Sequence, residues 1–306
     1  MSGHGEARVE AQAKLNLFLR VFARDPSGYH QLETLFCRIA LADTVTVGIT
    51  DSGRSLDVSG ARVPAGGLGP VEKNLAWRSA VAYAAATGFP DGFRITIDKR
   101  IPVGGGLGGG SADAGGVLRA LNALNPRPLP APDLLRIGAA LGADVPFLTQ
   151  SESAMALGTG YGERLQYLPA LPARPAWLIV PDVAVNTADA YRWLDESDRG
   201  ASPSQVAIER LESWRGVASV AANDFESVVA TRLPIIGRLL SALRTPELAS
   251  VLGEDAVVLL SGSGSTVAAV AGERPHLDLG PMPGNLGIPV IETETSEFVE
   301  PVVLTH

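Results

Sequence analysis

Alternating hydrophobic and polar positions predict several strands in the first hundred residues of the chain. Residues 14–23, 44–50 and 93–100 alternate with a period close to two, which is typical of half-buried strands. Residues 73–88 are instead rich in alanine with helical spacing, and they stop at a glycine. We therefore expect a strand-rich first part that also carries a helix.

Helical patterns become more frequent further along the chain. Residues 111–125 predict a helix that ends before Pro126, and a proline-rich connection leads to another predicted helix at 133–141. In the second half we expect strands at 176–180, 256–260 and 266–270, and helices at 187–195, 204–215 and 235–243.

The length and the proline distribution favour two domains. A chain of 306 residues is too long for one small core, and it fits two domains or one large α/β unit. The segment "ALPARP", residues 170–175, is the best candidate boundary. We expect a strand-rich N-terminal domain over 1–170 and an α+β C-terminal domain over 171–306.

Charge and cysteine content exclude several classes of protein. The net charge of −8 argues against broad binding to nucleic acid or to a membrane surface. Cys37 is the single cysteine, so no intramolecular disulfide can form and a cysteine-rich zinc site is excluded. The first 14 residues lack the apolar core of a signal peptide, and no apolar run is long enough to span a membrane. We expect a cytoplasmic protein.

The glycine-rich stretch "IPVGGGLGGGSADAGG", residues 101–116, is the main candidate for chemistry. It joins a predicted strand to a predicted helix, where glycines let backbone N–H groups approach phosphate oxygens and the helix N-terminus adds partial positive charge. Ser111 occupies the expected N-cap position, and its hydroxyl could meet a phosphate or a metal. A flexible linker is the weaker alternative, because this stretch leads directly into an apolar-periodic helix.

Two common phosphate loops fit this stretch poorly. The P-loop requires a lysine before Ser111, and none is present. The dinucleotide pattern GxGxxG fits Gly104, Gly106 and Gly109, but so many glycines match by chance, and Pro102 interrupts the expected strand-to-glycine turn. A dinucleotide-binding oxidoreductase remains an alternative.

The string P-x-x-x-G-L-G-x-G-S, from Pro102 to Ser111, resembles the phosphate loop of the GHMP small-molecule kinases. Five further segments occur in that family's order and resemble one branch, whose substrate carries a cytidine diphosphate group: 13–19, 28–36, 141–147, 223–228 and 261–265. Ala112 stands where the family usually has a second serine, so the metal ligands stay unassigned.

The resemblance implies a two-domain GHMP kinase fold and ATP-dependent phosphorylation of an alcohol with Mg²⁺. It further implies a role in making isoprenoid precursors, with a homoserine or mevalonate type of kinase as the rival within the family. The implied ATP-binding residues are Asn74, Pro102, Val103, Gly104, Gly105, Gly106, Leu107, Gly108, Gly109, Gly110, Ser111 and Ala112. The implied partner is a small molecule, and the sequence does not define the oligomeric state.

The resemblance also implies the catalytic pair. Asp144 alone could be an ordinary helix cap, and Lys14 alone could face water. By resemblance Asp144 is the catalytic base and Lys14 the active-site lysine beside it. Asn16, two residues along the same strand, faces the same side as Lys14 and is a candidate to position the substrate hydroxyl.

Three other features have both an ordinary and a functional interpretation. Tyr29 and His30 follow Gly28, so we expect both rings to stand clear of the core; the resemblance implies that they bind cytosine. Asn74 could simply cap a helix. The segment "SGSGS", 261–265, could be only a hairpin, whereas the resemblance makes it a loop over the phosphates.

Overall fold

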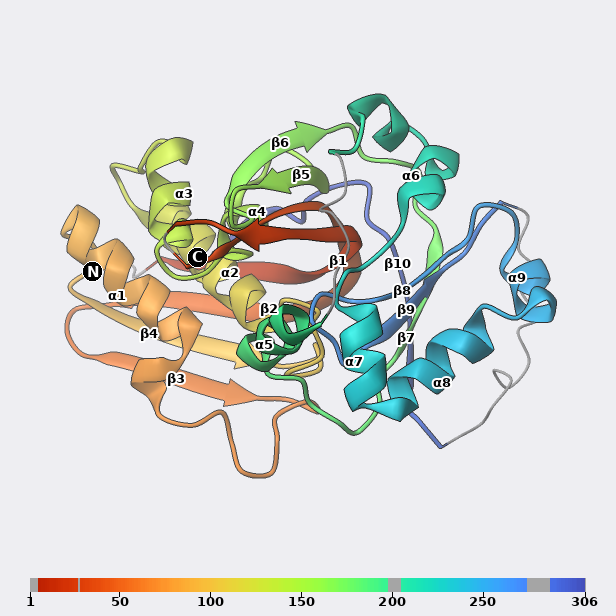
Figure 1. Ribbon diagram of the computed structural model, residues 1–306. Helices are drawn as coiled ribbons and strands as arrows, with labels where there is room; N and C mark the ends of the chain where they lie inside the picture. Colours follow the sequence, from red (N-terminus) through yellow and green to blue (C-terminus); the bar gives the residue numbers. More distant parts are fainter. Residues whose placement is uncertain (1–4, 27, 198–204, 274–286, 306) are drawn as a thin grey trace.

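The computed structural model describes residues 5–26, 28–197, 205–273 and 287–305 (Figure 1). Among these residues, the first sheet has seven strands. Five follow the order β11-β1-β2-β4-β3, while β5 pairs with β2 and β6 pairs with β5. Its strands are β1 (Glu6–Arg24), β2 (His30–Thr50), β3 (Arg54–Ser59), β4 (Gly92–Asp98), β5 (Met155–Thr159), β6 (Arg164–Leu168) and β11 (Val302–Thr305). The expected strands at 14–23, 44–50 and 93–100 are confirmed, as parts of β1, β2 and β4.

Four α-helices accompany the first sheet: α1 (Leu75–Thr87), α2 (Gly109–Leu124), α3 (Ala131–Ala139) and α4 (Val145–Thr149). A 3₁₀ turn, η1 (Val71–Lys73), precedes α1. Helix α1 ends as predicted, because Gly88 takes the left-handed conformation with φ of 70°. Helix α2 packs on β1 and β2 and contacts both α1 and α4, so it lies at the centre of this half of the molecule (Figure 1).

A second sheet of four described strands forms the other half, in the order β10-β7-β9-β8 and antiparallel throughout. It consists of β7 (Pro175–Ile179), β8 (Val257–Leu260), β9 (Val267–Val270) and β10 (Val290–Glu294). Figure 1 shows α7, α8 and α9 along this sheet. The helices of this half are α5 (Thr187–Glu196), α6 (Trp214–Val220), α7 (Glu226–Arg232), α8 (Pro234–Leu243) and α9 (Pro246–Leu252), with a 3₁₀ turn η2 (Ile208–Leu211).

The predicted helix over 204–215 is wrong. Residue 204 lies outside the described residues, and the rest divides into η2 and the start of α6. The first piece ends at Leu211, and Ser213 caps the second, because its hydroxyl accepts a hydrogen bond from the Gly216 amide. A Cβ on Gly216 would lie 2.0 Å from the carbonyl oxygen of Arg210, so the two pieces meet at a close backbone contact.

The chain returns to the first sheet at its end. Strand β10 pairs with β7 in the second sheet, and β11 then pairs with β1 in the first. The segment 171–306 therefore contributes a strand to the sheet built mostly by 1–170, and the division at 170 stays a prediction. No helix among the described residues is both long and apolar enough to cross a membrane.

Two adjacent glycines in α2 allow a test of this packing. A Cβ on Gly115 would lie 2.5 Å from the carbonyl oxygen of Leu148 in α4, whereas a Cβ on Gly116 would lie 3.3 Å from the Cβ of Ala11. Gly115→Ala should lower the free energy of unfolding by about 1–3 kcal/mol through overpacking. Gly116→Ala should change it little, because about 1 kcal/mol of helix propensity offsets a milder contact. Urea denaturation measures both, and equal losses would contradict this packing.

Candidate active site

A cleft of about 540 Å³ opens between the two halves of the molecule. It brings together residues that the sequence places far apart: Lys14, Asn16, Asn74, the glycine loop from Pro102 to Ser111, Asp144, and Gly262 of the second glycine loop. Of the expected ATP-loop residues, Ala112 is buried in α2 and does not line the cleft. Tyr29 and His30 also lie outside its lining.

Lys14 lies in β1 with its side chain only 4% exposed, so its charge does not face water. Its Nζ donates to Asn16 Oδ1 at 2.6 Å and to the Gly106 carbonyl oxygen at 2.8 Å. The same Nζ lies 3.5 Å from Asp144 Oδ2. A buried ammonium is costly unless it is paired and hydrogen-bonded, and here three groups from three segments satisfy it.

Asn16 points to the same side of β1 as Lys14, as the period of a strand predicts. Its amide nitrogen donates to Thr34 Oγ1 at 2.8 Å, and this hydroxyl donates to the Phe18 carbonyl at 2.7 Å. The chain of bonds orients the amide so that its oxygen faces Lys14. Thr34 was not recognised from the sequence, because a buried threonine in a strand carries no distinctive signal.

Asp144 immediately precedes α4, but its side chain makes no capping hydrogen bond. The simple helix-cap interpretation is therefore wrong for the side chain, although the residue occupies the cap position. Its carboxylate is 32% exposed and faces the cleft beside Lys14. A carboxylate that is open to solvent on one side and next to a lysine on the other can accept a proton from a bound hydroxyl.

The first glycine loop is bound tightly to β1 and to the second glycine loop. The Lys14 amide donates to the Leu107 carbonyl at 3.0 Å. Gly106 and Gly108 have φ of 76° and 74°, and a Cβ on Gly106 would lie 2.0 Å from the Ser261 carbonyl oxygen. These glycines are needed for protein packing as well as for any phosphate contact.

The N-terminus of α2 lines the cleft, but the helix begins earlier in the chain than the sequence predicted. The helix begins at Gly109, with Gly108 as its N-cap, so Ser111 is the third helical residue and the expectation that it is the N-cap is wrong. Gly108 can take the left-handed conformation that this start needs, which a serine would adopt only with strain. The first turn of α2 still lines the cleft, and amides at a helix N-terminus are able to bind an anion.

The second glycine loop joins β8 and β9 as an antiparallel hairpin, as the ordinary interpretation predicted. It also contacts the first loop: Ser261 Oγ donates to the Gly106 carbonyl at 3.0 Å, and the Thr266 amide donates to the Gly105 carbonyl at 3.2 Å. Gly262 and Ser263 line the cleft. The two loops therefore form one joined wall of the cleft.

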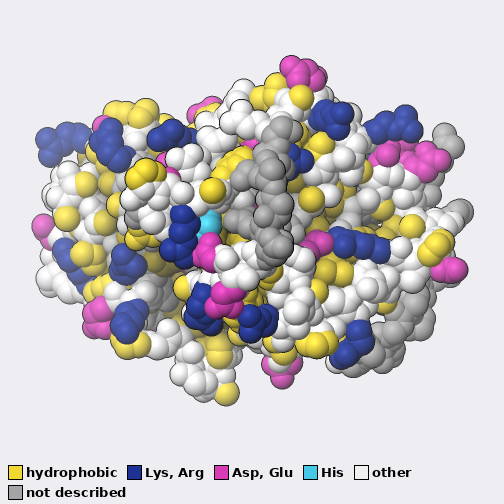
Figure 2. All heavy atoms as spheres, in the orientation of Figure 1, with side chains coloured by type: hydrophobic (Ala, Val, Ile, Leu, Met, Phe, Trp, Pro, Cys, Tyr) yellow, Lys and Arg dark blue, Asp and Glu magenta, His cyan; other side chains and the backbone are white. Residues whose placement is uncertain are grey.

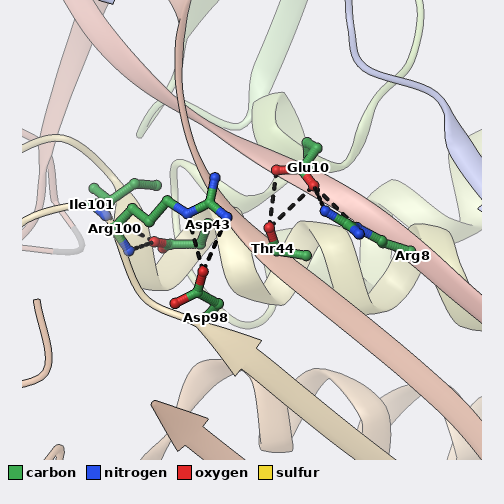
Figure 3. A network of polar contacts seen from close by, with 7 residues as sticks. All are labelled: Arg8, Glu10, Asp43, Thr44, Asp98, Arg100 and Ile101. Carbon is green, nitrogen blue, oxygen red and sulfur yellow. Dashed lines mark hydrogen bonds and ion pairs between the residues drawn. The ribbon is translucent and has the colours of Figure 1, made fainter. Parts of the chain in front are cut away.

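A buried ion cluster anchors the segment that leads into the first loop. Lys99 Nζ donates to Asp43 and, at 2.7 Å, to Asp113 Oδ2. Asp43 Oδ1 also accepts from the amides of Arg100 and Ile101, at 2.5 and 2.8 Å (Figure 3). Burial raises the pKa of Asp113 to about 7, although the ammonium of Lys99 opposes this rise. No sequence pattern indicated that these three side chains meet.

Tyr29 and His30 differ in how far their side chains are exposed to solvent. Tyr29 is 70% exposed, as expected, and the edge of its ring contacts Tyr161 with ring centres 5.9 Å apart. His30 is buried, so the expectation that its ring stands clear of the core is wrong. Its Nδ1 lies 2.7 Å from the Phe22 carbonyl oxygen and its Nε2 2.8 Å from Asp195 Oδ1. Both ring nitrogens are thus occupied by protein groups.

Aromatic residues that the sequence did not single out line the same cleft: Tyr161, Tyr191 and Phe225. Tyr191 stacks on His30 with ring centres 5.4 Å apart and meets Phe225 edge-on at 5.0 Å. Burial, together with the negative charge of Asp144, raises the pKa of Tyr191 to about 12. Its hydroxyl is therefore a protonated donor at neutral pH.

This fold and site define a small-molecule kinase of the GHMP class. The family model described as "GHMP kinases N terminal domain" matches residues 74–152. A homoserine kinase from Cytophaga hutchinsonii has the same fold, with a TM-score of 0.68 and 18% identity over 100% of this chain and 98% of its own. A solved mevalonate kinase matches with a TM-score of 0.63 at 12% identity, covering 94% of this chain and 98% of its own.

Closer relatives identify the branch. The 4-diphosphocytidyl-2-C-methyl-D-erythritol kinases of Moorella thermoacetica and Geobacter sulfurreducens are each 40% identical, over 87% of this chain and 90% of their own. A crystal structure of 4-(cytidine 5'-diphospho)-2C-methyl-D-erythritol kinase matches with a TM-score of 0.74 and 33% identity, over 94% of this chain and 99% of its own. The chain belongs to the 4-diphosphocytidyl-2-C-methyl-D-erythritol kinase family.

Gly108 provides a test of the site geometry. A Cβ there would lie 3.0 Å from Lys14 Cγ and 3.2 Å from Leu148 Cδ1, at a φ of 74° that disfavours any side chain. Gly108→Val should therefore displace Lys14 and lower turnover by about 10²-fold, the typical cost of a misplaced catalytic group. Gly66→Ala is the control, because its Cβ would meet nothing within 4 Å. Steady-state kinetics on both folded variants would measure this, and equal turnover would contradict the geometry.

Proposed function

We propose that this protein transfers the γ-phosphoryl group of ATP to the 2-hydroxyl of 4-diphosphocytidyl-2-C-methyl-D-erythritol, a step of the non-mevalonate route to isoprenoid precursors. The observation that carries the proposal is the buried Lys14, paired with Asp144 beside a glycine loop and a helix N-terminus. The name of the relatives at 40% identity supplies the substrate. Relatives of the homoserine and mevalonate type share the fold at 18% identity or less, which favours this substrate over theirs.

In this proposal the first glycine loop and the N-terminus of α2 bind the ATP phosphates. Backbone amides and the helix dipole act on the phosphate charge without any side chain. Asn74 accepts a hydrogen bond from the Ala76 amide at 2.8 Å and caps α1, yet it also lines the cleft. It would lie on the adenine side of the bound ATP.

Mg²⁺ would arrive with the ATP phosphates and neutralise their charge. Among the described residues, no group of three or more His, Cys, Asp or Glu side chains could hold a metal ion by itself. Mg²⁺ needs no such cage, since it often binds through substrate phosphates and one or two protein groups. The Ser111 hydroxyl, in the first turn of α2 and on the cleft, is the candidate for that contact.

The proposed chemistry follows from three side chains. Asp144 accepts the proton of the 2-hydroxyl as the hydroxyl oxygen attacks the γ-phosphorus, and the bond to the bridging oxygen breaks to release ADP. Lys14, 3.5 Å from that carboxylate, attracts the developing alkoxide. Asn16, whose amide is fixed by Thr34, positions the hydroxyl.

The cytidine end of the substrate would meet the aromatic residues. Tyr29 exposes a ring face on which cytosine can stack. His30 would support this wall through its stacking on Tyr191, because its ring nitrogens face Phe22 and Asp195. The second glycine loop would close over the diphosphate that lies between the two ends.

The surface suits a small-molecule partner. On the face drawn in Figure 2, the basic and acidic side chains are interspersed, and outside the grey atoms the basic ones form no continuous stripe. A broad nucleic-acid surface would need such a stripe. We propose a cytoplasmic enzyme whose partners are ATP and the cytidine-linked alcohol.

The pair Asp144 and Lys14 should act as one unit. Asp144→Asn should lower turnover by about 10²–10⁴-fold, the usual contribution of general-base catalysis, with ATP affinity nearly unchanged. Lys14→Ala should cause similar damage, and the double variant should lose less than the product of the two losses. Steady-state kinetics and ATP titration would measure these effects. Fully multiplicative losses would show that the two residues act independently.

A substitution of Tyr29 tests whether the substrate carries a cytidine group. Stacking on a base is worth about 1–3 kcal/mol, so Tyr29→Ala should raise the KM for the cytidine-linked substrate by about 5- to 150-fold and leave the ATP parameters unchanged. Tyr167→Ala is the control, since Tyr167 is an exposed tyrosine that lies outside the cleft.

A substrate analogue without the cytidine group completes this test. The wild type should already phosphorylate the analogue poorly, because remote binding energy helps to orient the reacting hydroxyl. Tyr29→Ala should make that activity little worse. If the wild type phosphorylates the analogue as well as the full substrate, the assignment of a cytidine-linked substrate is wrong. The protein would then be a kinase that accepts a broader range of alcohols.

A further inference from the structure

The segment from Ala222 to Glu226, just before and into α7, lies between β1 and the second glycine loop. The Leu19 amide of β1 donates to the Ala222 carbonyl at 2.8 Å, and the Asp224 amide donates back to the Leu19 carbonyl at 3.0 Å. Asp224 Oδ2 also accepts from the Val21 amide at 2.8 Å. The segment is therefore fixed to the strand that carries Lys14.

Asn223 joins this segment to the second glycine loop. Its side chain is buried, and its Nδ2 donates to the carbonyls of Leu260 and Gly262, both at 2.7 Å. Its Oδ1 accepts from the Phe225 amide at 2.9 Å. Two donors and an acceptor on one short side chain are the groups of a primary amide, which an aspartate of the same shape cannot reproduce.

A neighbouring side chain holds the same point of the loop. Glu226 Oε1 accepts from the Leu260 amide at 3.0 Å, and Arg244 in turn donates to both oxygens of Glu226, at 3.0 and 2.9 Å. The peptide groups at the start of the loop are thus bound at their carbonyls by Asn223 and at an amide by Glu226.

The loop position that Asn223 holds is next to the catalytic lysine. Gly262 has a φ of 55°, and a Cβ there would lie 3.2 Å from Lys14 Nζ, 3.5 Å from Asn16 Oδ1 and 3.1 Å from the Gly106 carbonyl oxygen. Gly262 therefore lies close to Lys14, Asn16 and the first glycine loop, with no space for a side chain between them.

We propose that Asn223 is a positioning residue for the phosphoryl transfer. It acts through the second glycine loop, which it holds against Lys14, Asn16 and the first glycine loop, and it does not touch the substrate. This inference rests on the proposed function, because it assumes that the Lys14 side of the cleft performs the chemistry. It assigns to the "NDFE" segment the task of coupling β1 to the second loop.

The test compares Asn223→Ala with Asn125→Ala. Asn125 is also a buried asparagine, and it too accepts from an amide two residues on, that of Arg127 at 3.0 Å, while donating to the Tyr83 hydroxyl at 2.9 Å. It lies after α2, outside the cleft lining. Both variants lose a buried amide, so both should show a lowered Tm.

Only Asn223→Ala should lower kcat, by about 10²-fold, the cost of misplacing catalytic groups by about 1 Å. The KM for ATP should change less than kcat, because α2 and the bond from the Lys14 amide to the Leu107 carbonyl do not involve Asn223. Amide hydrogen exchange should also quicken across 261–265 in Asn223→Ala and not in Asn125→Ala. Equal kcat in the two variants, or unchanged exchange in the loop, would overturn the inference.

Asn223→Asp gives a second route if the alanine variant does not fold. It keeps the acceptor for Phe225 and the shape, but it faces the Leu260 and Gly262 carbonyls without a donor, so kcat should again fall about 10²-fold. Wild-type activity on the cytidine-linked substrate is measured in the same series. No wild-type turnover would refute the proposed function, whereas wild-type turnover that Asn223→Asp leaves unchanged would refute the role of Asn223 alone.

Discussion

The rest of the site depends on one buried positive charge. The ammonium of Lys14 lies within a sheet strand with almost no exposure to water, and a charge in that position is stable only if the protein surrounds it with partners. Those partners come from β1 itself, from the first glycine loop and from the residue before α4. Because each must lie within a few ångströms of one nitrogen, the lysine determines how closely these segments approach.

Close approach explains why both loops are rich in glycine. Gly106 faces the carbonyl of Ser261, Gly108 faces the lysine stem, and Gly262 faces the lysine nitrogen. A side chain at any of these positions would separate segments that the charge network holds together. The same packing places the first turn of α2 on the cleft beside Lys14, where amides at a helix N-terminus are able to bind an anion.

Local pattern was enough to predict most elements, whereas the phosphate site at the glycine loop before α2 stays a prediction. Residues such as Lys14 and Asp144 could be paired only through family resemblance, since 130 positions separate them in the chain. The contacts of Thr34, Asp43, Lys99 and Tyr191 could not be predicted, because they arise where segments distant in sequence pack together. The exposure predicted for His30 was wrong for the same reason: Gly28 predicts a turn, but only the fold brings Tyr191 over the ring and Asp195 to its Nε2.

The most direct test of this account is a crystal structure with a non-hydrolysable ATP analogue and the cytidine-linked alcohol bound together. The distance to measure is that from the 2-hydroxyl oxygen to the Asp144 carboxylate. The account predicts a hydrogen-bond distance of about 2.6–3.2 Å, with Lys14 still beside Asp144 and the γ-phosphate in line with the hydroxyl. A hydroxyl bound well away from Asp144 and Lys14, with the phosphates outside the first glycine loop, would contradict it.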